Sequence, residues 1–162
     1  MNAEARGLWV EGEPVAKGRP RMTRSGHAYT PKRTERAEAA IRKAWIEEYG
    51  VDPVDVPVAV KIRFKYPTPK SWPMWKREQA GIYSLPKMSK PDIDNLVKTV
   101  MDALNGIAYK DDAQIYQIRA TKEYTLESKA STYITISAIK SKKDGKGREL
   151  YWRSGRKEAK EK

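Results

Sequence analysis

Residues 56–66 read VPVAVKIRFKY, and this stretch decides the fold. Every even position in it is apolar, while Lys61, Arg63 and Lys65 stand between the later ones. Because successive side chains of a strand point to opposite faces, this alternation predicts a β-strand with one buried face and one basic, solvated face. Pro57 favours an edge position or the first residues of the strand. The chain is therefore expected to be built on a sheet.

Period-2 alternation marks three further strand candidates, one of them weak. Residues 116–124 place apolar side chains at every second position except 122, residues 134–138 do so throughout, and residues 8–15 do so less regularly. The interval 125–130 between the first two is short enough for a β-hairpin. A single sheet of about four strands, mixed or antiparallel, is therefore expected.

Two segments carry the helical period instead. Residues 34–49 and 91–104 each place apolar side chains along one stripe, and a glycine follows each segment. The connection 67–90 contains four prolines, and a loop of this length is usually functional or mobile. One sheet with two packed helices places the chain in the α+β class.

The composition excludes several kinds of protein. A chain of 162 residues is long enough for one domain with its own core. The absence of cysteine and the single histidine, His27, exclude disulfide frameworks, thiolate zinc sites, cysteine nucleophiles and schemes that need two imidazoles. No apolar run approaches the ~18 residues of a membrane span, and the N-terminus lacks a signal-peptide core. A cytoplasmic protein without membrane contact is expected.

The excess of positive charge predicts an acidic partner. The formal net charge is +12, from 33 Lys and Arg against 21 Asp and Glu. Residues 17–43 hold nine basic and two acidic side chains, residues 140–162 hold ten and four, and the middle is nearly neutral. Nucleic acid gripped by these flanks is the favoured partner, with solubility as the alternative. Residues 141–162 are expected to be a flexible basic tail after a domain at 1–140.

Acidic residues gather in two places against this basic bias. Residues 90–98 read KPDIDNLVK, with Asp92 and Asp94 at the start of the second predicted helix, and Asp111 and Asp112 open the following strand. Two carboxylates ~5 Å apart repel by ~3 kcal/mol at an effective dielectric of ~20, and a divalent cation removes that cost. Hard oxygen ligands with open water positions are what Mg²⁺ prefers.

Helix geometry leaves a purely structural interpretation open for each acid. Since each helical residue turns ~100°, Asp92 and Asp94 converge only if Asp92 precedes the helix in a cap or extended conformation. Asp92 can instead be an ordinary N-cap, and the second acidic pair a solvated turn. Asp94, Lys98 and Asp102 form a polar stripe at i, i+4 and i+8, so Lys98 reaches either Asp94, as a surface pair, or a phosphate held beside it.

Three motifs together resemble the signature of RusA-type Holliday junction resolvases: KPDIDNLVK at 90–98, DALNG at 102–106 and DDAQ at 111–114. The basic opening GEPVAKGRPR at 12–21 is similar to that of the phage and bacterial branch of this family. The resemblance covers about residues 8–139. It implies a RusA-like fold and a homodimer that nicks four-way DNA junctions symmetrically, with Mg²⁺ as cofactor, Mn²⁺ as a substitute and no organic cofactor.

The resemblance also implies roles for individual residues. The catalytic, metal-binding carboxylates would be Asp92, Asp94 and Asp112. Lys98 matches the family's essential lysine, Asp111 ranks below Asp112, and Asp102 is a further acid near the site. A two-fold dimer suits a junction, because paired cuts in opposed strands need two equivalent sites. A bacterial cytoplasm, with a phage or prophage gene, is the expected setting.

Basic and aromatic residues outside the motif are candidates for DNA contact. The residues expected to bind DNA phosphates are Lys17, Arg19, Arg21, Arg24 and Lys90. A disordered basic arm is the alternative for the first four. Trp72 and Trp75 either stack on unpaired bases or, the favoured interpretation, cover a core edge or a dimer interface. His27 is interpreted as an ordinary loop residue.

Two other functions stay open. A non-catalytic, structure-selective DNA-binding protein would show salt-dependent binding and no Mg²⁺-stimulated nicking. A nuclease that prefers flaps or plain duplex would differ from a resolvase in the substrate that it cuts best. Substrate digests with and without Mg²⁺ therefore discriminate among the three.

Overall fold

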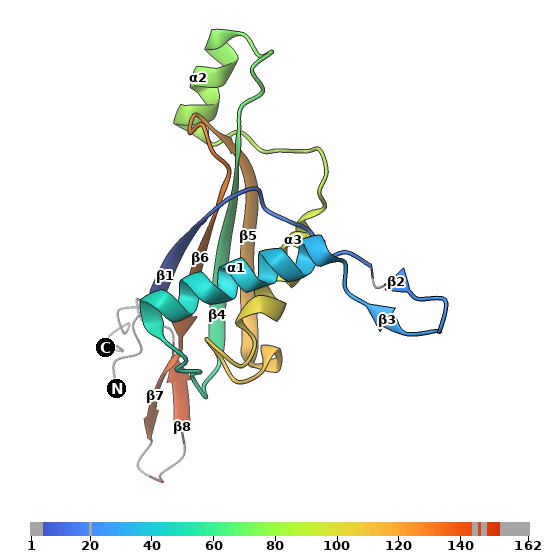
Figure 1. Ribbon diagram of the computed structural model, residues 1–162. Coiled ribbons are helices and arrows are strands. Elements are labelled where there is room, and N and C mark those ends of the chain that lie inside the picture. Colours follow the sequence, from blue (N-terminus) through green and yellow to red (C-terminus); the bar gives the residue numbers. More distant parts are fainter. Residues whose placement is uncertain (1–4, 20, 144–145, 147–148, 153–162) are drawn as a thin grey trace, which may run out of the picture.

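A computed structural model describes residues 5–19, 21–143, 146 and 149–152, and its centre is a four-stranded sheet (Figure 1). The strands are β1 (Arg6–Glu11), β4 (Val58–Pro67), β5 (Ile115–Thr125) and β6 (Ser131–Ala138), in the order β1–β6–β4–β5. β6 runs antiparallel to both β1 and β4, whereas β4 and β5 run parallel. The predicted α+β class, with one mixed sheet of four strands, is confirmed.

Strand β4 confirms the prediction made from residues 56–66. Its inward side chains are buried: Val58, Val60, Ile62, Phe64 and Tyr66. β4 lies inside the sheet rather than at an edge. Pro57 stands just before its first paired residue, so the missing N–H interrupts no ladder bond, and the Pro57 carbonyl accepts a bond from Ile139 N.

The hairpin expected across residues 125–130 is wrong. β5 and β6 are antiparallel to each other, but β4 lies between them and pairs with both. The short connection therefore crosses the end of β4 instead of joining neighbouring strands. The inner face of β4 is almost wholly buried. A central position suits such a strand, because both of its edges are hydrogen-bonded to neighbouring strands while its inner face packs against the helices.

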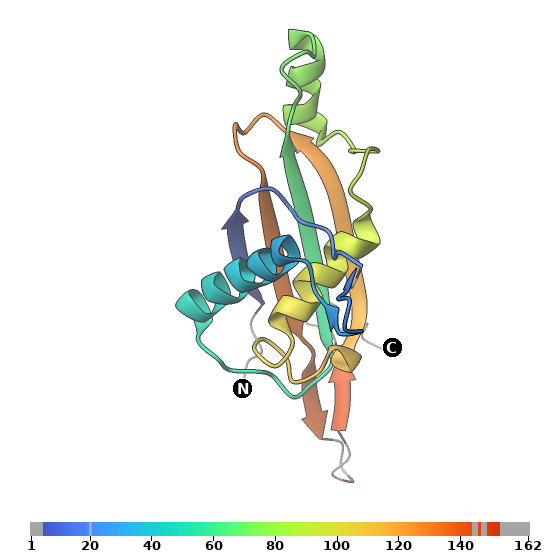
Figure 2. The same cartoon turned by 45° about the vertical axis from the view of Figure 1, so that its right-hand side comes forward.

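Helices α1 (Lys32–Tyr49) and α3 (Ile93–Leu104) pack side by side on one face of the sheet, as predicted (Figures 1 and 2). Trp45 of α1 and Leu96 of α3 are buried in the common core. A third helix, α2 (Met74–Tyr83), lies at one end of the sheet within the connection predicted to be a loop. It begins directly after Pro73, a position where helices tolerate proline.

Two small ribbons extend from this body. They are β2 (Arg21–Met22) with β3 (Ala28–Tyr29), and β7 (Lys140–Lys143) with β8 (Glu149–Trp152). The weak strand predicted at 8–15 is β1, which ends at Glu11. The β7–β8 backbone pairs within the segment predicted to be a flexible tail, and residues 144–145, 147–148 and 153–162 of that tail lie outside the described residues. The division into a domain at 1–140 and a flexible tail at 141–162 stays a prediction.

The second face of the sheet carries the basic side chains of β4, as predicted, but part of their charge is paired. Arg63 binds Glu123 at 2.6 Å, and the ammonium of Lys65 lies over the ring of Trp9. The helix-covered face holds the core and, at the N-terminal end of α3, the acidic motif.

Within the described ranges, none of the helices has the length and apolar character needed to cross a membrane.

Candidate active site

Two exposed acids stand at the N-terminal end of α3. Asp92 is the N-cap residue with an extended backbone, φ −71° and ψ 139°, and Asp94 lies in the first helical turn. The condition under which their carboxylates can converge is thereby met. The Asp92 side chain makes no capping hydrogen bond, so the alternative of an ordinary capping role is not what the structure shows.

The acids at this end have no ion-pair partner within the described ranges. The surface pair proposed as an alternative for Asp94 and Lys98 is not formed there, and both side chains are exposed. Lys98 lies one turn beyond Asp94 on the same stripe, so its ammonium is available to a phosphate placed near the helix end.

Two lysines that sequence reasoning missed hold the chain just before Asp92. Lys122 of β5 donates to the carbonyls of Ser89 and Pro91 at 2.7 and 2.6 Å. Lys87 donates to the carbonyl of Lys90 at 2.6 Å. The available signal was the interrupted alternation of residues 116–124, where Lys122 takes an inward position. These contacts fix the backbone from which Asp92 projects.

Of the second acidic pair, only Asp112 is left without a structural role. Asp111 caps a short 3₁₀ helix (Asp112–Gln114): its carboxylate accepts from Ala113 N at 2.8 Å, and its own N–H donates to Gln114 Oε1. The Gln114 amide then donates to the carbonyls of Val54 and Val56. This accounts for ranking Asp111 below Asp112.

Asp112 belongs with the C-terminal half of α3 rather than with its N-terminal end. Tyr109 is buried, and its hydroxyl donates to the Met101 carbonyl at 2.8 Å. Burial raises the pKa of that hydroxyl strongly, and the charges of Asp112 and Asp102 raise it further. Asp94 precedes Asp102 by two turns, about 12 Å along the helix axis.

The metal-binding role expected of Asp92, Asp94 and Asp112 stays a prediction. Among the residues that the structure describes, no three acidic or histidine side chains come together in a group that could hold one ion. The donors nevertheless have the right chemistry, because carboxylate oxygens suit Mg²⁺. Mg²⁺ that also binds substrate phosphates and water needs only one or two protein carboxylates, and Asp92 and Asp94 fit that requirement.

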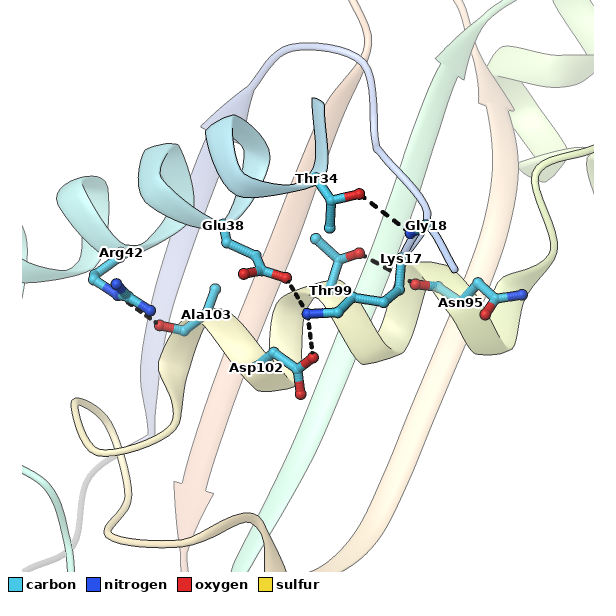
Figure 3. Close-up of polar contacts among 9 residues, drawn as sticks. All are labelled: Lys17, Gly18, Thr34, Glu38, Arg42, Asn95, Thr99, Asp102 and Ala103. Carbon is cyan, nitrogen blue, oxygen red and sulfur yellow. Dashed lines mark hydrogen bonds and ion pairs between the residues drawn. The ribbon is translucent and has the colours of Figure 1, made fainter. Parts of the chain in front are cut away.

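Lys17 lies at the centre of a polar network between the two helices (Figure 3), and its role in phosphate binding stays a prediction. Its ammonium binds Glu38 of α1 and Asp102 of α3, both at 2.6 Å, and its side chain is only 20% exposed. Burial lowers the pKa of Lys17, but the hydrogen bonds to Asp102 and Glu38 outweigh it and raise the pKa above its usual value. Lys17 is a structural cation.

Three of the other predicted phosphate ligands are exposed, and Arg21 is placed by its backbone alone. Arg19 and Arg24 are exposed, and Arg21 lies in β2. Lys90 is exposed beside Asp92, and both line a groove of about 590 Å³ between residues 13–18, the start of α1 and the segment before α3. Lys90 therefore lies beside Asp92 without forming an ion pair with it among the described residues.

The two tryptophans of the long connection have different environments. Trp72 packs edge-on against Tyr124, with ring centroids 4.7 Å apart, and Lys76 lies over its other face. That placement confirms the favoured interpretation of Trp72 as a cover for the end of the sheet. Trp75 is exposed. His27 lies in the turn between β2 and β3, where Ser25 Oγ contacts its ring.

The fold and its acidic helix end match a known class of DNA-cutting enzyme. The family model described as "Endodeoxyribonuclease RusA" matches residues 11–137, a span that contains the central strands, α3 and every candidate acid. A match over most of the chain defines an endodeoxyribonuclease. The chain belongs to the RusA family, and the resemblance found in its motifs is confirmed.

A bacterial relative matches most of the chain. The chain is 35% identical over 130 residues to "Uncharacterized protein YqaN" of Bacillus subtilis (strain 168), which covers 77% of this chain and 92% of that protein. The match extends over nearly the whole length of the relative. Its name states no activity, so the family assignment rests on the family model.

Proposed function

We propose that this endodeoxyribonuclease resolves four-way DNA junctions, as a homodimer that requires Mg²⁺ or, in substitution, Mn²⁺. The observation that carries the proposal is the pair Asp92 and Asp94: two exposed carboxylates, without ion-pair partners in the described part of a strongly basic chain. Two such charges beside a polyanion are unfavourable unless a divalent cation lies between them and the phosphate.

The residues of the chain have distinct tasks in this proposal. Asp92 and Asp94 hold the cation, which when bound neutralises charge on the phosphate and promotes ionisation of water. Lys98 approaches the same phosphate from the next turn of α3 and stabilises its developing negative charge. Lys90, Arg19, Arg21 and Arg24 bind flanking phosphates, with salt-sensitive affinity. Lys87 and Lys122 position the backbone of Asp92.

The proposed dimer follows from the reaction. Resolution of a junction requires two cuts in opposed strands, and a two-fold dimer supplies two equivalent sites at a fixed spacing. Within a single protomer, Asp112 is grouped with the C-terminal half of α3. We propose that it acts on the bound DNA or metal once the dimer has formed on the junction. A measured mass of one protomer on the junction would contradict the homodimer.

A side-by-side digest tests the proposal. Four-way junction, flap and linear duplex of matched sequence are incubated with the protein, with Mg²⁺, with Mn²⁺ and with EDTA. We expect paired nicks in the junction that depend on either metal and little cleavage of the duplex. Faster cleavage of the flap or the duplex would contradict the resolvase proposal and favour a nuclease specific for that substrate. Salt-dependent binding without nicking would favour a non-catalytic DNA-binding protein.

A further inference from the structure

The β2–β3 ribbon projects from the helix-covered side of the protein (Figures 1 and 2), and its exposed apolar side chains have no part in the site described above. Arg21 pairs with Tyr29, and Met22 pairs with Ala28. Met22 keeps 68% of its surface exposed and Tyr29 keeps 45%. Large apolar side chains that stay exposed on a projecting element indicate a contact surface.

The two ends of the ribbon meet at a tight neck. Gly18 N donates to Thr34 Oγ1 at 3.1 Å, and a Cβ added to Gly18 would lie only 2.8 Å from Cγ of Pro31. The neck thus has room only for glycine at position 18. It connects the segment that enters the ribbon, at Gly18, with the segment that leaves it for α1, at Pro31 and Thr34. This closure argues against the alternative of a free basic arm.

Lys17, one residue before the neck, places the ribbon beside the exposed acids. Its N–H donates to the carbonyl of Asn95 at 2.8 Å, within the first turn of α3 that also carries Asp94. Its ammonium binds Glu38 and Asp102 from the two helices (Figure 3). The ribbon therefore starts from a fixed point next to the proposed catalytic residues.

Hydrogen bonds within the turn maintain the shape of the ribbon. Thr23 N donates to the His27 carbonyl at 2.8 Å, and His27 N donates to Thr23 Oγ1 at 3.0 Å. Gly26, at φ +80°, supplies the left-handed residue that closes the turn. The apolar side chains before and after the turn are consequently presented on a defined element.

The charge around the ribbon selects a polyanion as its partner. The flanking cations that are exposed and form no ion pair within the described residues are Arg19, Arg24, Lys32 and Arg36. Because Met22 is opposed by Ala28, it lies on the face opposite to Tyr29. Methionine is used as a wedge between base steps, and tyrosine stacks on unpaired bases.

We propose that the β2–β3 ribbon enters the opened centre of branched DNA, where Tyr29 stacks on an unpaired base and Met22 packs on the other side of the ribbon. The flanking arginines and lysines bind the converging phosphates. The inference rests on the proposed junction substrate and assigns the recognition of the branch point to a segment that carries none of the candidate acids. The ribbon sets the preference for branched DNA, whereas α3 carries the hydrolysis.

Fluorescence of 2-aminopurine placed at the branch point tests this proposal. Binding is measured in Ca²⁺ on Asp94→Asn protein, so that cleavage does not interfere. We expect the double substitution M22A/Y29A to weaken junction binding about 10-fold and to abolish the fluorescence change, with duplex affinity nearly unchanged. Tyr29→Phe keeps the ring and is expected to keep the signal. The double substitution I82A/Y83A removes two α2 side chains that are both 71% exposed, and is the matched control.

Junction affinity and fluorescence equal to wild type in the M22A/Y29A protein would overturn the proposal. Equal losses of junction and duplex affinity would also overturn it, because the ribbon would then bind DNA without regard to the branch. If the M22A/Y29A protein cut junctions normally and still preferred branched DNA, the role of the ribbon would be refuted while the proposed junction cleavage would stand. Wild-type protein that neither binds nor cuts junctions would refute the proposed function and this inference together.

Discussion

The two ends of helix α3 carry acids in opposite electrostatic situations. In its C-terminal half, Asp102 is paired at 2.6 Å with Lys17, whose ammonium also binds Glu38 of α1. Asp94, two turns earlier on the same polar stripe, has no such partner in the part of the chain that the structure describes. One end of the helix therefore uses its acid for stability, and the other leaves its acids available to a ligand.

Cations are present at both ends, but they bind different acceptors. Lys87 and Lys122 approach the N-terminal end and bind main-chain carbonyls of residues 89–91. A carbonyl carries no net charge, so these bonds fix the backbone while the carboxylate of Asp92 stays ionic and unpaired. A site that has to accept both a metal ion and a phosphate needs this combination of fixed backbone and free carboxylate.

The largest expected effect separates Asp94 from Asp102. We expect Asp94→Asn to slow junction cleavage by at least ~100-fold with little change in stability, because a neutral amide no longer attracts the cation. Asp102→Asn is expected to leave most of the cleavage and to lower the free energy of unfolding by about 1–2 kcal/mol, because Lys17 loses a charged acceptor. Single-turnover cleavage and urea unfolding measure the two effects, and equal losses of activity would contradict the comparison.

The next effect concerns Lys17 itself. Lys17→Met leaves Glu38 and Asp102 facing each other without a cation, so we expect the free energy of unfolding to fall by about 2–3 kcal/mol. Lys17→Arg keeps the charge and is expected to restore most of this loss. Urea unfolding at pH 7 provides the measurement. The opposite outcome would be a Lys17→Met protein of unchanged stability that binds DNA more weakly, with a salt dependence reduced by about one phosphate contact. That result would support the phosphate-binding role first predicted for Lys17.

The elements that carry these acids follow from local sequence patterns. The alternation in β4 and the apolar stripe of residues 91–104 each specify which face is buried, and both patterns can be recognised from residues close together in the sequence. The order of the strands is not held locally, because the interval 125–130 fits a hairpin and a crossing over β4 equally well. α2 was missed because Pro73, taken as part of a loop, is a tolerated start of a helix.

The site was predictable in its residue types and less so in its contacts. Asp92 and Asp94 stood out because they oppose the basic character of the chain, and that contrast needs no coordinates. The ion pairs of Lys17 were missed because its partners, Glu38 and Asp102, are distant in sequence and meet it only when α1 and α3 pack together. Charge pattern shows where cations are, whereas long-range packing decides which of them are already paired.

A smaller effect tests whether the lysines at the N-terminal end hold Asp92 in place. Lys122→Gln removes the ammonium that binds the Ser89 and Pro91 carbonyls, so we expect cleavage to slow about 10-fold through misplacement of Asp92. The loss should appear in the rate at saturating junction and hardly in binding. Lys110→Gln, which loses only an exposed pair with Asp55, is the control. A loss of binding alone would make Lys122 a phosphate ligand instead.

The smallest effect is confined to alkaline pH and to the C-terminal half of α3. Burial, Asp112 and Asp102 raise the pKa of Tyr109 above that of the unfolded chain, and the pKa of Lys17 is raised as well. As pH rises above ~10, the unfolded chain loses these protons first while the native state keeps them. The stability that both groups contribute is thus complete below pH ~10 and is lost as pH rises through their native pKa values.

Tyr109→Phe isolates the part of this decline that belongs to the Tyr109 hydroxyl. The variant loses the hydroxyl bond to Met101, about 1 kcal/mol at pH 7, but is expected to lose less further stability between pH ~8 and ~11 than wild type does. Urea unfolding at both pH values measures the difference. Tyr66, whose pKa burial and Glu13 raise to about 12, titrates in both proteins and cancels from the comparison. An equal decline in the two proteins would show that the native state does not raise the pKa of the Tyr109 hydroxyl.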